Sequence, residues 1–411
     1  MISFTGFTND IAKKSDKLFY RTFIFCLLLL TNFLYPRISF SQNTPPVEEQ
    51  KKEDYIEQII GQDENNTGDY ESLVDLEKNV RDRPINLNTA TAEDMKPLHE
   101  LVLLTDVQIN AILTYREKLG KFISVYELQA VPYLDLETIK ALLPYVKVTS
   151  DISSAQIKTR DLLFGGDYTV LLRGQQILEE QKGFSPVDST SSSDTRYLGS
   201  PLGLYARFRY QYGTKFSYGI TGQKDAGEEF FKGTQKQGFD FYSAHVYYRG
   251  NNWLKAVSLG DYELKFGQGL LVASGFGISK SSLVMSVKYG GRTLRPYTST
   301  NEFNFFRGAA AVVGTKNISV TAFISHKKID GNVGAVDTLG DNIFVTSIGG
   351  DGYHRTPAEV ADKNTISQTV FGGNADFRIH TLTLGLSAIH SQFSVPLEPA
   401  VDPYSQFHFH G

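Results

Sequence analysis

Glycines are the first residues of this sequence whose type and spacing could support chemistry. Gly267 and Gly269 flank Gln268, and Gly275 and Gly277 follow shortly after. A glycine-rich turn lets backbone N–H groups approach a phosphate, as in dinucleotide-binding folds. That use requires a strand before the glycines and a helix after them, and no such pattern surrounds this stretch. The spacing therefore predicts a tight loop, and we expect no cofactor.

Histidines offer two further kinds of site. His408 and His410 lie two positions apart, so on a strand they share one face and could chelate a metal ion. No third ligand lies near them in the sequence, so we expect no metal site. His245 and His390 could each serve a serine hydrolase, but no serine stands out as the nucleophile. The sequence therefore predicts a protein without catalytic residues that is not an enzyme.

The elements that would position these residues begin with an export signal. Basic residues between positions 13 and 21 precede an apolar run that contains Cys26, and Ser39 and Ser41 precede a cut before Gln42. This order predicts a cleaved signal peptide over residues 1–41. A retained membrane anchor is the alternative, although the run is shorter than the ~20 residues that span a bilayer. Because Cys26 is the only cysteine, we expect no disulfide in the exported chain.

Residues 42–83 are polar and predict an acidic tether with short helices. Residues 47–83 carry a net charge of −7, against −4 for the whole chain. Apolar residues recur at helical spacing in two pieces, 55–60 and 73–80. We interpret the segment as a spacer, with a docking site for a partner as the alternative. No segment has the dense basic face that is typical of a dedicated nucleic-acid-binding protein.

Residues 84–148 predict a compact domain of four short helices. A hydroxyl cap at Thr91 begins the first helix, and the second spans Asp106–Leu119 and ends at Gly120. Ser124 begins a capping box for the third helix, and Asp135 caps the fourth. Two helix–turn–helix units of nearly equal length follow from these caps.

This segment resembles the tandem helix-hairpin-helix of the ComEA-like competence DNA receptors. The matching strings are Ile85–Met95, Ile112–Phe122, Ser124–Leu128 and Val131–Asp135. In DNA-binding hairpins of this kind, a Gly-x-Gly turn lets backbone N–H groups approach a phosphate at a helix N-terminus. The polar residues that could contact a nucleic-acid backbone are Asn86, Asn88, Thr89, Thr105, Lys118 and Lys121.

The hairpin turns depart from the DNA-binding pattern. We expect Glu100 and Thr105 at the glycine positions of the first hairpin, and Tyr133 and Asp135 at those of the second. A carboxylate at the place of a phosphate is repulsive. The domain is therefore expected to be structural or to bind a periplasmic protein partner, with DNA as the less favoured partner.

From about Asp167 onward, apolar and polar residues alternate with the period of two that is typical of half-buried strands. Short turns are expected at 213–214, 250–252, 315–317 and around 380. Long loops are expected at about 179–200, 224–239, 263–302, 329–365 and 394–405. Short and long connections thus alternate along the chain, as they do in outer-membrane barrels.

Two architectures fit these strands: a membrane barrel and a secreted soluble β-sandwich. Arg207, Arg209 and Arg378 lie opposite a continuous apolar face, which favours an antiparallel transmembrane β-barrel over residues 160–411, in contact with outer-membrane lipid. About ten strands are visible, and the last, Phe407–Gly411, stops in mid-pattern. Either the barrel closes with this short strand, or, as we expect, it is incomplete here and the chain continues past Gly411.

The stretches Gly260–Gly277 and Arg295–Ala310, joined to the helical segment, resemble helix-hairpin-helix domain-containing outer-membrane β-barrel proteins of Bacteroidota. The resemblance implies an outer-membrane protein with its helix-hairpin-helix domain in the periplasm. The expected function is transport or envelope assembly, with the helical domain as a docking module. A competence-like component for DNA uptake is the alternative.

Overall fold

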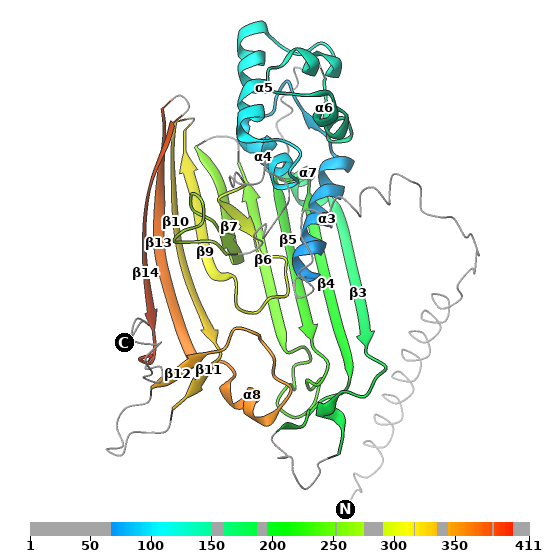
Figure 1. The fold of residues 1–411 in the computed structure, drawn as a ribbon, viewed down its shortest axis with the longest axis vertical. Helices are drawn as coiled ribbons and strands as arrows, with labels where there is room; N and C mark the ends of the chain where they lie inside the picture. Colours follow the sequence, from blue (N-terminus) through cyan, green and yellow to red (C-terminus); the bar gives the residue numbers. More distant parts are fainter. Residues whose placement is uncertain are drawn as a thin grey trace, which may run out of the picture. The chain divides into compact units, whose positions relative to one another are not determined.

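The computed structural model describes residues 67–149, 159–186, 195–250, 253–274, 291–315, 317–334, 344–379 and 382–397. A helical region is followed by a large antiparallel sheet (Figure 1). Four predicted features lie outside the described residues: the signal peptide expected at 1–41, most of the expected tether, the last two glycines of the glycine-rich loop and the strand expected at 407–411. Within the described ranges, no helix is both long and apolar enough to cross a membrane.

The helical region consists of short elements joined by tight turns. They are α3 (Thr67–Asp82), β1 (Ile85–Asn86), α4 (Ala92–Glu100), α5 (Asp106–Leu119), η1 (Val125–Ala130), α6 (Leu136–Leu142), η2 (Leu143–Tyr145) and β2 (Val146–Lys147), and α7 (Thr159–Phe164) leads into the sheet.

Capping residues begin and end these helices as expected. Thr91, Thr105 and Ser124 each form a capping box with the residue three positions later. Gly120 ends α5 with a φ of 96°, where a side chain would strain the backbone. The third helix is a 3₁₀ helix, η1, and Asp135 caps α6 through the Thr138 amide.

One apolar core holds the helical region together, and it includes α3. Leu73 and Val80 of α3 are buried in the same cluster as Leu98, Ile112 and Leu128. The parallel pair of β1 and β2 brings the two ends of the hairpin segment together. The helix expected within the tether thus packs as part of this unit, and we call residues 67–148 the helical domain.

The sheet is built almost entirely from strands that follow one another in the chain. Its strands are β3 (Asp167–Gln176), β4 (Leu202–Tyr212), β5 (Phe216–Lys224), β6 (Phe241–Arg249), β7 (Leu254–Leu264), β8 (Leu294–Pro296), β9 (Phe306–Gly314), β10 (Ile318–Ile329), β13 (Ile366–Ile379) and β14 (Leu382–Phe393). Their order is β14-β13-β10-β9-β7-β6-β5-β4-β3, with β8 beside β7. The loops add η3 (Lys182–Phe184), the pair β11 (Gly331–Val333) and β12 (Val345–Ile348), and α8 (Pro357–Asp362).

These ten strands form an antiparallel sheet that is not closed into a barrel. Across the described residues, β3 pairs only with β4, and β14 pairs only with β13. The antiparallel sheet of about ten strands is therefore confirmed and is open over the described residues, whereas its closure into a barrel stays a prediction. Hairpin pairing follows from local turns and alternation, whereas a closing pair joins distant strands and depends on tilt and stagger.

The two faces of the sheet have opposite character. Along β6, alternate residues are buried, and these include Ser243, His245 and Arg249, while Val246 and Tyr248 on the other face are exposed. Along β14, Leu382, Leu384 and Leu386 are all exposed, and Leu386 keeps 74% of its surface accessible. The covered face, which we call the inner face, thus holds charged and hydroxyl side chains together with buried aromatic residues such as Tyr247 and Phe323, whereas the exposed outer face is mainly apolar.

The connections alternate between short and long, as expected. Short turns join β4 to β5, β6 to β7, β9 to β10 and β13 to β14, whereas long segments join β3 to β4, β5 to β6, β7 to β8 and β10 to β13. The helical domain lies at the short-turn end, because Arg249 at the end of β6 donates to Asp94 of α4, and Arg83 stacks on Tyr212 at the end of β4. The long loops, with α8, lie at the other end (Figure 1).

Candidate functional site

Two of the six predicted nucleic-acid contacts are used inside the helical domain. The Asn88 amide donates to the Phe122 carbonyl (2.9 Å) and accepts from the Phe122 N–H (2.8 Å), and the residue is buried. The Asn86 carboxamide oxygen accepts from the N–H groups of Asn88 and Thr149. These asparagines position loops of the domain, so their side chains are not free to contact a phosphate.

The other four predicted contacts lie nearer the surface. The Thr105 hydroxyl caps α5 by accepting from the Gln108 N–H. Thr89, Lys118 and Lys121 are exposed. The structure therefore leaves two lysines and a threonine of the predicted contacts on the surface.

Each hairpin turn contains one residue with a left-handed backbone, and neither residue is glycine. Val102 has a φ of 56° and Tyr133 has a φ of 68°. The expected position of Tyr133 is confirmed, whereas Glu100 is not a turn residue but the last residue of α4. Asp135 and Thr105 are the helix caps that follow. Tyr133 is 75% exposed, so a tyrosine side chain stands at the turn position that glycine occupies in a DNA-binding hairpin.

Glu100 points away from the hairpin turn and binds the sheet. Its carboxylate accepts two hydrogen bonds from the Arg292 guanidinium (2.9 and 2.8 Å) and one from the Arg292 N–H (2.9 Å). Arg295 lies 3.9 Å away. Burial alone would raise the pKa of Glu100, but the attraction of Arg292 outweighs it and lowers this pKa to about 2. The carboxylate predicted to repel DNA is thus the centre of an internal ion pair.

A second acid of the helical domain binds two arginines at once. The Asp75 carboxylate of α3 lies 2.6 Å from the Arg207 guanidinium and 3.0 Å from that of Arg209, both on the inner face of β4. Each arginine side chain is less than a tenth exposed. The predicted placement of these two arginines opposite the apolar face is confirmed, and their counter-ion comes from the helix expected within the tether.

The third link joins α4 to the end of β6. Arg249 donates to the Asp94 carboxylate (2.8 Å), the Glu93 carbonyl (3.0 Å) and the Thr214 hydroxyl (2.6 Å). Together these contacts bring three carboxylates of the helical domain onto the arginines of the sheet. We call the arginine face the set Arg207, Arg209, Arg249, Arg292 and Arg295.

A cavity of about 80 Å³ lies between the helical domain and the sheet. Arg209, Arg292 and Arg295 line it, together with Glu100 and Glu263. Glu263 binds Arg295 at 2.6 Å. Among the described residues, the arginine face thus contacts the carboxylates of Asp75, Asp94, Glu100 and Glu263.

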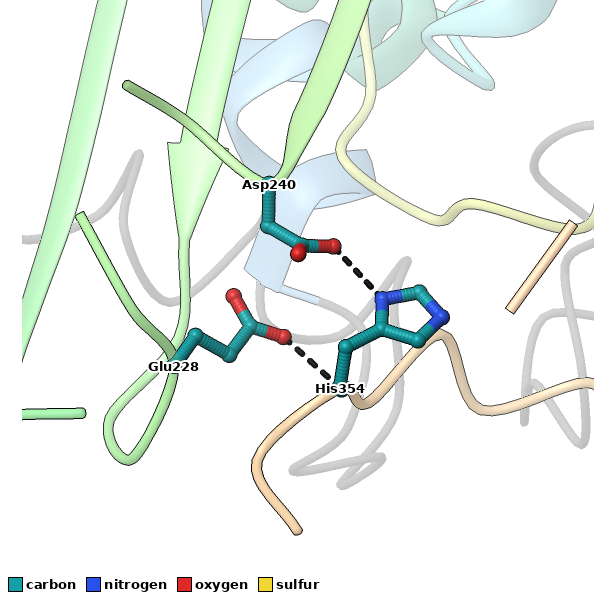
Figure 2. A group of neighbouring side chains, drawn as sticks. All are labelled: Glu228, Asp240 and His354. Atoms are coloured by element: carbon teal, nitrogen blue, oxygen red, sulfur yellow. Dashed lines mark hydrogen bonds and ion pairs between the residues drawn. The ribbon is translucent and has the colours of Figure 1, made fainter. Parts of the chain in front are cut away.

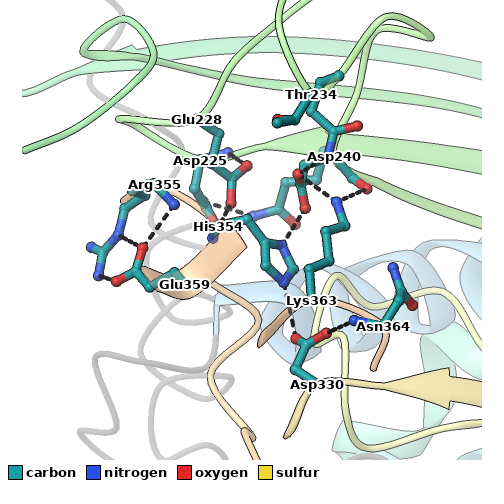
Figure 3. Close-up of polar contacts among 12 residues, drawn as sticks. Asp225, Glu228, Thr234, Asp240, Asp330, His354, Arg355, Glu359, Lys363 and Asn364 are labelled. Carbon is teal, nitrogen blue, oxygen red and sulfur yellow. Dashed lines mark hydrogen bonds and ion pairs between the residues drawn. The ribbon is translucent and has the colours of Figure 1, made fainter. Parts of the chain in front are cut away.

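The long loops at the other end hold a second buried cluster, which the sequence did not single out. Figure 2 shows His354 beside Asp240 and Glu228, whose ligand-capable atoms lie within 4.8 Å of one another. The imidazole is hydrogen-bonded on both sides, to Asp240 at 2.5 Å and to Asp330 at 3.0 Å (Figure 3). Lys363 also binds Asp240, at 2.7 Å. We call these five residues the loop cluster.

The chemistry of the loop cluster suits a protonated histidine better than a metal ion. Burial alone would lower the pKa of His354, but its hydrogen bonds to Asp240 and Asp330 raise this pKa to about 10. Both ring nitrogens then donate, which leaves neither available as a ligand. Burial and the nearby Asp240 raise the pKa of Glu228 to about 7. The ion pairs of the loop cluster therefore hold the loop after β5 against the loop after β10.

A serine does lie beside one of the histidines considered above. The Ser217 hydroxyl is 2.8 Å from His245 Nε2, and both residues are buried on the inner face. This pair was not predictable from sequence spacing, because its partners lie on the neighbouring strands β5 and β6. His390 is on the exposed part of β14. Gly267 and Gly269 form a tight turn after β7, each with a positive φ, in agreement with the predicted loop.

Comparison with known proteins identifies only the helical part of the chain. Residues 80–147 match the family model of the helix-hairpin-helix motif, which agrees with the predicted resemblance of residues 84–148. No curated protein matches the chain. No solved structure matches it either. The chain therefore combines a helix-hairpin-helix motif with a large antiparallel sheet.

Proposed function

We propose that this protein is an outer-membrane β-barrel whose helix-hairpin-helix domain docks on the polar inner face of its own sheet. The observation that carries the proposal is the character of the two faces of the sheet. Compared with a protein that folds in water, the order is reversed, since apolar side chains are exposed and charged side chains are buried. Tyr168, Val170 and Leu172 of β3 illustrate the exposed face, and each keeps more than half of its surface accessible. In water such a surface is unfavourable, whereas in a bilayer it contacts lipid.

The arrangement of the connections supports a periplasmic helical domain. Outer-membrane barrels have short periplasmic turns and long outer loops. The helical domain contacts the short-turn end through Arg249 and Tyr212, so this rule puts it on the periplasmic side. Closure of the open sheet, by strands outside the described residues or by a partner, is part of the proposal, because an unpaired edge is not stable in a bilayer.

The proposed role is transport or envelope assembly, with the helical domain as a plug on the inner face. Its acids bind the arginine face at one end, and the loop cluster joins the long loops at the other end. A path along the inner face would therefore require one of these two charged regions to open. This makes the domain a docking module whose first partner is the barrel itself.

Heat-modifiable migration tests this proposal. The membrane fraction is solubilised in detergent, and electrophoresis is run before and after boiling. A folded barrel migrates faster before boiling, and we expect this shift for the full chain. A matched pair of variants adds detail: Val246→Arg on the outer face should reduce membrane insertion, whereas Ala244→Ser on the same strand should not. Recovery of a soluble protein without a heat-dependent shift would overturn the barrel.

DNA uptake is the second candidate function, and the match to the helix-hairpin-helix motif favours it. Thr89, Lys118 and Lys121 are the predicted contacts that remain exposed. A salt titration of DNA binding by the full chain in detergent tests it. Affinity below one micromolar with a steep salt dependence that Lys118→Gln and Lys121→Gln reduce would favour DNA uptake over the plug.

A further inference from the structure

The arginine face resembles a binding site that the protein fills with its own carboxylates. The Arg292 guanidinium donates two hydrogen bonds to the Glu100 carboxylate. Arginine binds carboxylate and phosphate groups with this bidentate geometry. Arg207 and Arg209 converge on one carboxylate of Asp75. Three buried guanidinium groups thus present anion-binding geometry to two acids of the helical domain.

The fit of these acids is incomplete. The cavity of about 80 Å³ lies beside Arg209, Arg292 and Arg295. The Nε atom of Arg209 is buried, has no hydrogen-bond partner, and belongs to a side chain only 9% exposed. A buried donor without an acceptor is unfavourable, so a ligand with more oxygen atoms than Asp75 and Glu100 supply would satisfy the site better.

We propose that the arginine face binds a small polyanion that carries two or more phosphate or carboxylate groups, and that this ligand displaces the helical domain. The inference deepens the proposed function, since it names the ligand class that would release the plug. Asp75 and Glu100 occupy the positions of the ligand's anionic groups in the docked state. Ligand and domain therefore exclude each other.

Competition within one chain sets the expected affinity. A tethered carboxylate acts at an effective concentration on the order of millimolar, so an external anion must outcompete it. Removal of the internal competitors should tighten anion binding, while removal of the arginines should abolish it. These opposite directions separate a binding site from a purely structural ion pair.

Calorimetric titration of the full chain in detergent micelles, with sodium pyrophosphate and with sodium citrate at constant ionic strength, tests the proposal. We expect Asp75→Asn/Glu100→Gln to bind at least tenfold more tightly than the wild-type protein. We expect Arg209→Gln/Arg292→Gln to bind at least tenfold more weakly, and the control Arg378→Gln, on the exposed end of β13, to match the wild type. Binding of pyrophosphate alone would assign phosphate groups, and binding of citrate alone would assign carboxylates.

Release of the domain is measured in parallel by energy transfer. Trp253, the only tryptophan, lies in the turn after Arg249, and an acceptor is attached to Lys121→Cys in a Cys26→Ser background. Either anion should reduce the transfer at concentrations where sodium chloride of equal ionic strength does not. The proposal is overturned if chloride acts equally, or if Asp75→Asn/Glu100→Gln binds no more tightly than the wild type. Heat-modifiable migration of each variant tests separately whether the barrel is folded. The proposed barrel and the proposed anion binding can therefore fail independently.

Discussion

The arginine face and the loop cluster both hold other segments of the chain against the sheet by ion pairs, but they use different cationic side chains. At the short-turn end, arginines of the sheet bind carboxylates of the helical domain. At the long-loop end, His354 and Lys363 bind Asp240 and Asp330. Arginine stays charged at every accessible pH, whereas histidine does not. The first region should therefore weaken in acid alone. The second should weaken in alkali as His354 loses its proton, and again in strong acid, where Asp240 and Asp330, whose pKa values their hydrogen bonds to His354 lower against the effect of burial, become protonated.

The largest effect is expected from loss of His354. His354→Gln removes the positive charge between Asp240 and Asp330, and the cost to the free energy of unfolding should be about 4 kcal/mol. Thermal unfolding followed by circular dichroism measures it. His390→Gln, at an exposed position, is the matched control and should change little. Equal stabilities of the two variants would contradict the role of the loop cluster.

The pH dependence of the loop cluster has a definite sign. Because the pKa of His354 is raised to about 10, its stabilisation is complete below about pH 6.5 and is lost as the pH rises towards 10. The raised pKa of Glu228, about 7, acts in the same direction between about pH 4.5 and 7. Proteolysis of the 344–365 segment should therefore accelerate from neutral to alkaline pH, and much less so in His354→Gln.

The next effect is expected from Glu100. Its lowered pKa corresponds to roughly 3 kcal/mol of stability that is present above about pH 4.5 and is lost as the pH falls towards 2. Glu100→Gln should remove that acid dependence and release the helical domain at neutral pH. Energy transfer from Trp253 measures the release, and Glu137→Gln, at an exposed acid of α6, is the control. An unchanged acid transition in Glu100→Gln would show that another group governs docking.

Arg249→Gln should have a smaller effect, because the Asp94 carboxylate is more exposed than that of Glu100. It loses hydrogen bonds to the Asp94 carboxylate and the Glu93 carbonyl of the helical domain, which together should contribute about 2 kcal/mol to docking. We expect partial loss of energy transfer and an unchanged alkaline transition of the loop cluster. A shift of that alkaline transition would mean that the two ends are coupled.

Tyr133→Gly should have the smallest effect on stability. Glycine relieves the left-handed backbone at this turn but adds freedom to the unfolded chain, so the net change should be within about 1 kcal/mol. The same substitution restores a hairpin glycine and so tests the alternative function. We expect no gain in DNA affinity by salt titration, and a tenfold gain would favour the DNA-uptake alternative.

The strands and caps were predictable from the sequence because they depend on neighbours along the chain. Alternation over residues 202–212 predicted β4 and its buried arginines, and the hydroxyl at Thr91 predicted the start of α4. Connection lengths also predicted which turns would be short. Membrane location, export and the strand at Phe407–Gly411 stay predictions, since the described residues do not test them.

The contacts that define the candidate site were not predictable in the same way. Glu100 and Arg292 are 192 positions apart, and Asp75 and Arg207 are 132 apart, so no local spacing indicates either pair. The sequence put Glu100 in a hairpin turn because the family pattern has a glycine near that position. The turn falls instead at Val102, and α4 extends through Glu100, which directs its carboxylate to the sheet. His354 lies in a long loop, where spacing carries no information about its partners.

A charge exchange between Glu100 and Arg292 tests the docking of the helical domain most directly. Energy transfer between Trp253 and an acceptor at position 121 is compared in the wild-type protein, Glu100→Arg, Arg292→Glu and the double variant. Docking on the arginine face predicts high transfer in the wild type, low transfer in each single variant and substantial recovery in the double variant. Equal transfer in all four proteins would contradict it.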